Sequence, residues 1–180
     1  RATAFKQGFG AKLAQGSWRL ANGYGHPEVS MSVKKQELPA YDPRGVQGQG
    51  LAFATSNRGG SHVRAYLIAR DMLSHPQPVD PQEILSKPTW VKAFQDLTAV
   101  IDSAGMCLFT SFALGMPEYT ALINAATGWN NTPEQTMAIG ERIWNLERQF
   151  NLRAGLTAAD DTLPPRLLEV PIAEGPNKGR

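Results

Sequence analysis

The stretch "DSAGMC", Asp102 to Cys107, places an acid, a glycine and a thiol close together. It holds the single cysteine of the chain and follows a segment with helical apolar spacing. Two interpretations are open: a helix end with a buried free thiol, or half of a site whose other half lies elsewhere.

A second candidate group follows the turn-forming stretch "NRGGS". His62 is a possible acid or base near neutral pH, and Arg64 is a permanent cation. Each residue, taken alone, is more often structural. Arg58, in the turn itself, is not chosen as a candidate site residue. The stretches at 41–45, "YDPRG", and 160–166, "DDTLPPR", are interpreted as turns that brace loops.

Common catalytic and metal-binding signatures are absent from the sequence. It contains no Gly-x-x-x-x-Gly-Lys-Ser/Thr phosphate loop and no His-Glu-x-x-His pair. One cysteine cannot build a cysteine-rich zinc site or an internal disulfide. Taken alone, the residues indicate only a soluble, mostly helical domain.

The composition is that of one globular domain with a core: 180 residues, 42% hydrophobic and 19% charged. A net charge of +2 is too small to indicate nucleic acid or an acidic membrane surface. No apolar run approaches the roughly 20 residues of a spanning helix, and the N-terminus lacks a secretory signal. We expect a cytoplasmic protein, and the start at Arg1 suggests a piece of a longer polypeptide.

The spacing of apolar residues predicts a mainly α domain with long connections. The clearest helix has apolar residues four, three and four positions apart, namely Trp90, Phe94, Leu97 and Ile101. Asp102 and Gly105 come where this helix should end.

A second long helix is expected to begin at a capping box, in which Thr132 caps and Gln135 reaches back. Its predicted buried stripe consists of Ile139, Ile143, Leu146 and Phe150. A shorter helix before it should end at Gly128.

The first part of the chain is less regular. Residues 1–22 predict a short helix broken by glycines, and residues 28–45 an extended segment and a turn. Residues 45–60 are either a closely packed helix or an irregular loop. Residues 61–73 look helical, with inward positions at Val63, Tyr66, Leu67 and Ile68.

Four separated blocks carry a resemblance more specific than any single residue. They are "AYDPRGVQGQGLAFATSNRGGSHVRAY", "DSAGMCLFTSFA", "GERIWNLERQFNLRAGLTAADDTLPPRL" and "EGPNKGR", in this order. They closely resemble the C-terminal half of the aldehyde ferredoxin oxidoreductase family, the tungsten-pterin enzymes. The resemblance extends from about residue 16 to residue 180.

The resemblance implies a three-domain parent protein with its cofactors at the domain interface. Two pterin dithiolenes would hold one tungsten, or occasionally molybdenum, beside a 4Fe-4S cluster. Such enzymes oxidise aldehydes to carboxylic acids and pass electrons through the cluster to ferredoxin or a similar carrier. Residues 1–180 would be the end of the second and most of the third domain, both helical. The N-terminal β-rich domain and the cluster-binding cysteine run would lie outside them.

The resemblance also assigns roles within the opening stretch. Asp102 would accept hydrogen bonds from the amino and ring N–H groups of one pterin, and Gly105 would turn the backbone tightly beside it. Met106 would present its backbone to the pterin. Cys107 would be the fourth ligand of the 4Fe-4S cluster. The other three ligands, from a Cys-x-x-Cys-x-x-x-Cys run, should lie upstream.

The stretch "SHVR" matches a second part of the family's site. His62 would lie beside the metal and move protons during aldehyde oxidation, and Arg64 would contact the pterin cofactor. The dithiolene sulfurs would supply most metal ligands, so the shortage of His and Cys clusters does not argue against the family.

Two hypotheses about function follow. The first is part of an aldehyde oxidoreductase that needs the rest of its polypeptide or a partner subunit, with an aldehyde substrate and a ferredoxin-like acceptor. Isolated, the chain would be inactive and would expose its interface. The second is a non-catalytic structural or partner-binding unit derived from the same fold. A homodimeric parent is compatible with both, and the particular aldehyde or other carbonyl substrate stays open.

Overall fold

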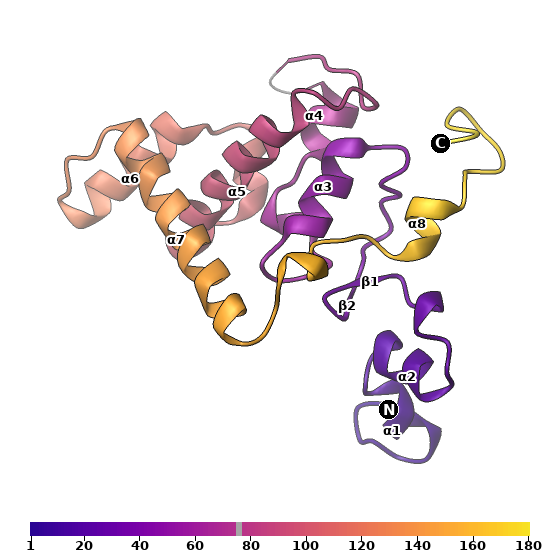
Figure 1. Ribbon diagram of the computed structural model, residues 1–180. Coiled ribbons are helices and arrows are strands. Elements are labelled where there is room, and N and C mark those ends of the chain that lie inside the picture. Colours follow the sequence, from indigo (N-terminus) through magenta and orange to yellow (C-terminus); the bar gives the residue numbers. More distant parts are fainter. Residues whose placement is uncertain (75–76) are drawn as a thin grey trace.

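The computed structural model describes residues 1–74 and 77–180 and is mainly helical (Figure 1). Helices account for 54% of it, and the described residues contain just two short strands. The predicted mainly α class is therefore confirmed.

The first half of the chain contains short elements. Its helices are α1 (Phe9–Leu13), α2 (Ser17–Gly23), α3 (Gln47–Thr55) and α4 (Ile68–Leu73), with 3-10 turns η1 (Pro27–Val29) and η2 (His62–Arg64). Strand β1 (Ser32–Val33) pairs antiparallel with β2 (Gln36–Glu37), with Ser32 opposite Glu37. Figure 1 shows α1 and α2 apart from the other helices.

The second half of the chain holds the long helices. They are α5 (Lys87–Ser103), α6 (Met116–Thr127) and α7 (Pro133–Arg153), followed by the short α8 (Pro165–Glu169), with 3-10 turns η3 (Leu108–Phe112) and η4 (Ala158–Asp160). The predicted capping box is present: Gln135 N donates to Thr132 Oγ1, and Thr132 N donates to Gln135 Oε1. Gly128 ends α6 with a left-handed φ of 75°.

Helices α5 and α7 pack against each other more extensively than any other pair of elements (Figure 1). Their backbones approach closely at Gly140, where an added Cβ would lie 2.1 Å from the carbonyl oxygen of Asp96. Glycine is required there because any side chain would meet the backbone of α5. This crossing fixes α5, whose last turn carries Asp102.

A small core joins α3 and α5 to the segment that follows the "NRGGS" turn. It consists of Ala52, Ala65, Leu67 and Val91. Residues 45–60 therefore contain a helix rather than an irregular loop. An added Cβ at Gly48 would lie 2.9 Å from Asp71 Oδ2, so α3 packs closely, as its small residues suggested.

The predicted continuous helix at 61–73 is wrong in its first half. The chain forms the 3-10 turn η2, becomes extended at Ala65 (φ −163°, ψ 97°), and enters α4 at Ile68. At the break, the backbone N–H of Leu67 donates to Gln49 Oε1 at 3.1 Å and to Ala65 O at 3.0 Å rather than to a carbonyl one helical turn back. Leu67 is fully buried, whereas the other inward positions are partly exposed.

The predicted buried stripe of α7 is only half correct. Ile139 and Ile143 are partly buried, but Leu146 and Phe150 are 68% and 71% exposed. Gly140, in the first half of α7, lies against α5, whereas the second half is hydrogen-bonded to the loop at Asn57 and, through Arg148, to Asp161. Within the described residues, this apolar surface has no cover.

Charged residues brace the loops, as the sequence predicted. Asp161, in "DDTLPPR", accepts from both Arg148 (3.0 and 2.6 Å) and Lys34 (2.8 Å), whose side chain is 3% exposed. In "YDPRG", Asp42 pairs with Arg44, and this guanidinium lowers the pKa of the Asp42 carboxyl. No helix of the described residues is both long and apolar enough to cross a bilayer.

Candidate functional site

The "DSAGMC" stretch forms the C-terminal cap of α5. Gly105 N donates to Asp102 O at 3.1 Å, and Met106 N donates to Ile101 O at 3.0 Å. Gly105 has φ of 68°. These two bonds around a left-handed glycine are a Schellman motif. The glycine therefore serves the helix end first, and the Met106 N–H is already engaged.

The cap leaves open space and a free thiol beside it. Among the described residues, leaving out the two chain neighbours, no atom lies within 4 Å of a Cβ added at Gly105. Cys107 is exposed, so the interpretation of its thiol as a buried hydrophobic group is wrong. Its carbonyl accepts from Thr110 Oγ1 at 2.6 Å, which fixes the backbone where η3 begins.

Arg64 and Asp102, 38 residues apart, meet directly. Arg64 Nη1 lies 2.7 Å from Asp102 Oδ2. The contact joins the two stretches that the sequence selected separately. It also offsets an unfavourable position, because a carboxylate in the last turn of α5 lies at the negative end of the helix dipole.

His62 is held among aromatic rings. Its ring centroid lies 5.5 Å from that of Tyr41 and 5.7 Å from that of Tyr66, and both contacts are tilted or edge-on. The two tyrosine hydroxyls are 3.0 Å apart. Phe112 packs edge-on against Tyr66 at 5.8 Å. The rings limit the orientations that the imidazole can adopt.

This surrounding also favours the neutral imidazole. Burial lowers the pKa of His62, and the nearby Arg58 cation lowers it further. Burial and the hydroxyl contact with Tyr41 raise the pKa of Tyr66 to about 12. At neutral pH the cluster therefore presents a neutral imidazole beside the protonated phenol of Tyr66.

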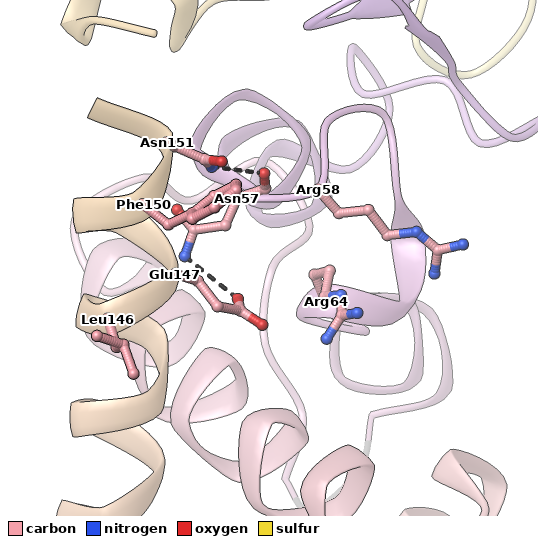
Figure 2. A pocket seen from close by; sticks show the side chains of 7 residues that line it. All are labelled: Asn57, Arg58, Arg64, Leu146, Glu147, Phe150 and Asn151. Carbon is pink, nitrogen blue, oxygen red and sulfur yellow. Dashed lines mark hydrogen bonds between the residues drawn. The ribbon is translucent and has the colours of Figure 1, made fainter. Parts of the chain in front are cut away.

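A pocket of about 410 Å³ adjoins Arg64 (Figure 2). Figure 2 shows Arg58 and Arg64 on one side and the Glu147 carboxylate of α7 facing them. The exposed Leu146 and Phe150 complete the α7 wall. Two cations and one acid thus line an open pocket that is partly apolar.

The loop before η2 is tied to α7 by two amide side chains. Asn57 Nδ2 donates to Trp144 O at 2.9 Å, and Asn151 Nδ2 donates to Asn57 O at 2.7 Å (Figure 2 shows the second bond). The Asn57 Oδ1 is buried without a hydrogen-bond partner among the described residues. These bonds set the position of the pocket's arginine side relative to α7.

The Met106 side chain faces a different space. It lines an apolar groove of about 630 Å³ between α5, α6 and α7, together with Val100, Leu122 and Trp129. Leu122 and Trp129 are 51% and 56% exposed. Of the predicted site residues, the structure brings Arg64 and Asp102 together, and Arg64 lines the pocket. His62 lies among aromatic rings instead, and Met106 faces the apolar groove.

Sequence reasoning missed the residues that surround these groups. Tyr41 was assigned to a structural turn, and Tyr66 to the inward face of a helix. Arg58 and Glu147 were not selected. Tyr41 and Glu147 come from segments far from His62 and Arg64 along the chain, so sequence spacing carries no signal for them. Arg58 and Tyr66 each lie four residues from His62, but that spacing does not by itself predict a contact.

The residues fit a pterin better than a directly bound metal. Asp102 offers a partly exposed carboxylate, the backbone at Gly105 leaves room, and Arg64 Nε is buried without a partner among the described residues. A flat ligand that carries N–H donors and an acceptor atom could donate to the Asp102 carboxylate, approach the backbone at Gly105 and accept from Arg64 Nε. In the same part of the chain, no three His, Cys, Asp or Glu side chains form a metal-binding group.

Comparison with known proteins identifies the family. A family model described as "Aldehyde ferredoxin oxidoreductase, domains 2 & 3" matches residues 1–180. The chain belongs to the aldehyde ferredoxin oxidoreductase family. The resemblance found in the sequence is thereby confirmed.

Curated relatives in the family are closely similar over this region. The tungsten-containing aldehyde ferredoxin oxidoreductase of Pyrococcus furiosus is 60% identical over 178 residues, and that of Thermococcus kodakarensis is 56% identical. The corresponding protein of Pyrococcus horikoshii is 54% identical. In each case the match covers 98% of this chain but 29% of the relative. Most of each relative thus lies outside the region compared.

Proposed function

We propose that this chain is the C-terminal helical part of a tungsten- or molybdenum-pterin oxidoreductase that oxidises aldehydes to carboxylic acids. The observation that carries the proposal is the Arg64–Asp102 contact, which joins two stretches selected separately from the sequence. The rest of the parent polypeptide, or a partner subunit, would supply the β-rich domain and the remaining cluster ligands. A ferredoxin-like carrier would accept the electrons in the cytoplasm.

Asp102, Gly105 and Met106 would bind one edge of a pterin. The Asp102 carboxylate would accept from the pterin N–H groups, since it stands at a helix end with one side exposed. The open backbone at Gly105 would allow the ligand to approach. The Met106 N–H is used in the helix cap, so its contribution would be its carbonyl or its apolar side chain.

Cys107 would be the fourth ligand of a 4Fe-4S cluster. Its exposed side chain can reach a group that is held mainly by another part of the protein. As a thiolate it would bind iron. When bound, the metal–pterin group and the cluster supply the two-electron redox chemistry and the route for electrons.

His62 would accept and release protons in the reaction. Oxidation of an aldehyde to an acid consumes one water and releases two protons and two electrons, so a base near the substrate assists it. The neutral imidazole favoured by burial and by Arg58 suits this role. The rings of Tyr41 and Tyr66 would keep the imidazole in place and limit its exposure to water.

The test is aldehyde oxidation by the whole parent protein, purified anaerobically and assayed with a one-electron dye. His62→Gln should lower kcat by about 100-fold or more, with the metal content unchanged. Glu28→Gln, an exposed change in η1, is the control and should have no effect. Absence of aldehyde-dependent dye reduction in the unmodified protein would contradict the proposal and favour a structural or partner-binding unit.

A further inference from the structure

The turn of the β1–β2 hairpin has an unfavourable backbone conformation at both of its positions. Val33 pairs with Gln36, so Lys34 and Lys35 alone connect the two strands. Both lysines lie in the left-handed region, with φ of 48° and 66°. Turns of this kind favour asparagine and glycine, because other side chains adopt a positive φ at a cost. Such a conformation persists where the surrounding structure holds it, and it is often found at functional sites.

The contacts of the Lys34 side chain give a reason for a lysine in this turn. The side chain is 3% exposed, and its Nζ lies 2.8 Å from Asp161 Oδ1. The same Nζ donates to Ala54 O, in the last turn of α3, at 2.8 Å. Asp161 also accepts from Arg148 of α7, at 3.0 and 2.6 Å. The ion triad of Lys34, Asp161 and Arg148 therefore joins the hairpin to α7 and to the end of α3.

The loop of residues 57–61 lies between the two elements that the ion triad joins. On the hairpin side, Gly60 N donates to Val33 O at 3.1 Å, and a Cβ added at Gly59 would lie 2.7 Å from that same oxygen. On the α7 side, Asn57 forms two hydrogen bonds with the helix, at 2.9 and 2.7 Å. The position of the loop therefore depends on how the hairpin and α7 are held relative to each other.

This loop leads directly into His62, where η2 begins. Ser61, the residue before it, is buried. Burial lowers the pKa of His62, and the cation of Arg58, which belongs to the loop, lowers it further. A movement of the loop would therefore displace both the imidazole and a charge that acts on it.

We propose that the ion triad positions His62 for proton transfer by holding the 57–61 loop between the β1–β2 hairpin and α7. The triad acts through His62 rather than through contact with the reacting atoms, so its three members are positioning residues. This inference rests on the proposed function, in which His62 moves protons.

The experiment uses the whole parent protein, loaded with its cofactors, and compares variants of neighbouring residues. Lys34→Met leaves the Asp161–Arg148 pair in place, so no charge of the triad loses its only partner and the variant should fold. Asp161→Asn, which breaks both links, is the second variant. Lys35→Met is the matched control, because it removes an exposed cation from the same turn. His62→Gln and the double variant Lys34→Met/His62→Gln complete the set.

Two properties are measured for each variant, well below its unfolding temperature. The first is kcat and KM for aldehyde-dependent dye reduction, expressed per bound tungsten or molybdenum. The second is amide hydrogen exchange in the 57–61 loop, followed by mass spectrometry. The second readout reports on the loop without any contribution from catalysis.

We expect Lys34→Met to lower kcat about tenfold or more with little change in KM, because a misplaced catalytic group lowers the rate even when the substitution is distant. Exchange in the loop should become faster by about tenfold or more, since the hairpin that covers it is released. Asp161→Asn should show both effects, and Lys35→Met should match the unmodified protein. The double variant should be no slower than His62→Gln alone, because the triad acts through His62.

Two results would overturn the inference while leaving the proposed function intact. In the first, His62→Gln is slow but Lys34→Met has a normal kcat, whether or not its unfolding temperature falls; the triad then serves stability alone. In the second, the losses of the two single changes multiply in the double variant, as those of independent residues would. If His62→Gln itself has a normal kcat, the proposed role of His62 fails, and the inference fails with it.

Discussion

The close crossing of α5 and α7 gives a sharp prediction for Gly140→Ala. A Cβ at this position would lie 2.1 Å from Asp96 O and 3.0 Å from Val100 Cγ2. Because a carbon and an oxygen approach no closer than about 3.2 Å, the helices must separate by about 1 Å. Overpacking costs about 1–3 kcal/mol, and a backbone obstacle places this case at the upper end. The higher helix propensity of alanine offsets about 1 kcal/mol of this destabilisation.

The expected net loss for Gly140→Ala is therefore about 2 kcal/mol in the free energy of unfolding. Urea unfolding followed by circular dichroism measures it as a lower midpoint with an unchanged slope. Gly23→Ala is the matched control. Gly23 also lies in a helix, yet a Cβ there meets no atom of residues 1–74 or 77–180 within 4 Å, so its midpoint should stay the same or rise. A midpoint for Gly140→Ala equal to that of Gly23→Ala would refute the close crossing.

Three further changes test other parts of the structure. Lys87→Met should lower the free energy of unfolding by about 3–5 kcal/mol, because it leaves Asp71 buried without the cation that lies 2.8 Å away. The double change Lys87→Met/Asp71→Leu should recover most of this loss. A loss below about 1 kcal/mol in the single variant would contradict the buried pair. Tyr66 has its pKa raised to about 12, so its stabilising contribution is complete below about pH 10 and is lost as the pH rises toward 12. Tyr66→Phe should therefore show a smaller fall in unfolding free energy over that range than the unmodified protein, and an equal fall would contradict the shift. The exposed Cys107 should react with a maleimide in the folded, metal-free chain about as fast as in the urea-unfolded chain, whereas slow labelling would indicate a buried thiol.

The long helices could be predicted because their signals are local. The apolar spacing of Trp90 to Ile101 indicated α5, and the Thr132–Gln135 capping box fixed the start of α7. The same spacing could not show whether the apolar face is covered. Leu146 and Phe150 continue the stripe of α7 but are exposed, because cover depends on what packs there.

The site could be predicted in its residues but not in its contacts. The sequence selected Arg64 and Asp102 separately, and their pairing became visible only when η2 was seen packed on α5. The break at Ala65 has the same origin. There the Leu67 N–H donates to the Gln49 side chain, 18 residues away, as well as to the nearby Ala65 carbonyl. Short-range spacing carries no information about such contacts.

The local role of Gly105 shows how one residue can satisfy two interpretations. The stretch "DSAGMC" is a helix end, since its glycine closes a Schellman motif. The same motif turns the chain so that Cys107 is exposed and the space beside Gly105 is open. The helix-end interpretation is thus correct for the backbone, whereas its buried thiol is wrong.

Metal and cofactor analysis of the whole parent protein, purified without oxygen, tests whether Cys107 completes a 4Fe-4S cluster beside a metal–pterin group. Tungsten, molybdenum, iron and pterin are quantified together in the unmodified protein and in Cys107→Ala. We expect about four irons per tungsten or molybdenum, and loss of the cluster's electron paramagnetic resonance signal in Cys107→Ala. Absence of iron, tungsten and molybdenum from the anaerobic preparation, or an unaltered cluster signal in Cys107→Ala, would contradict it.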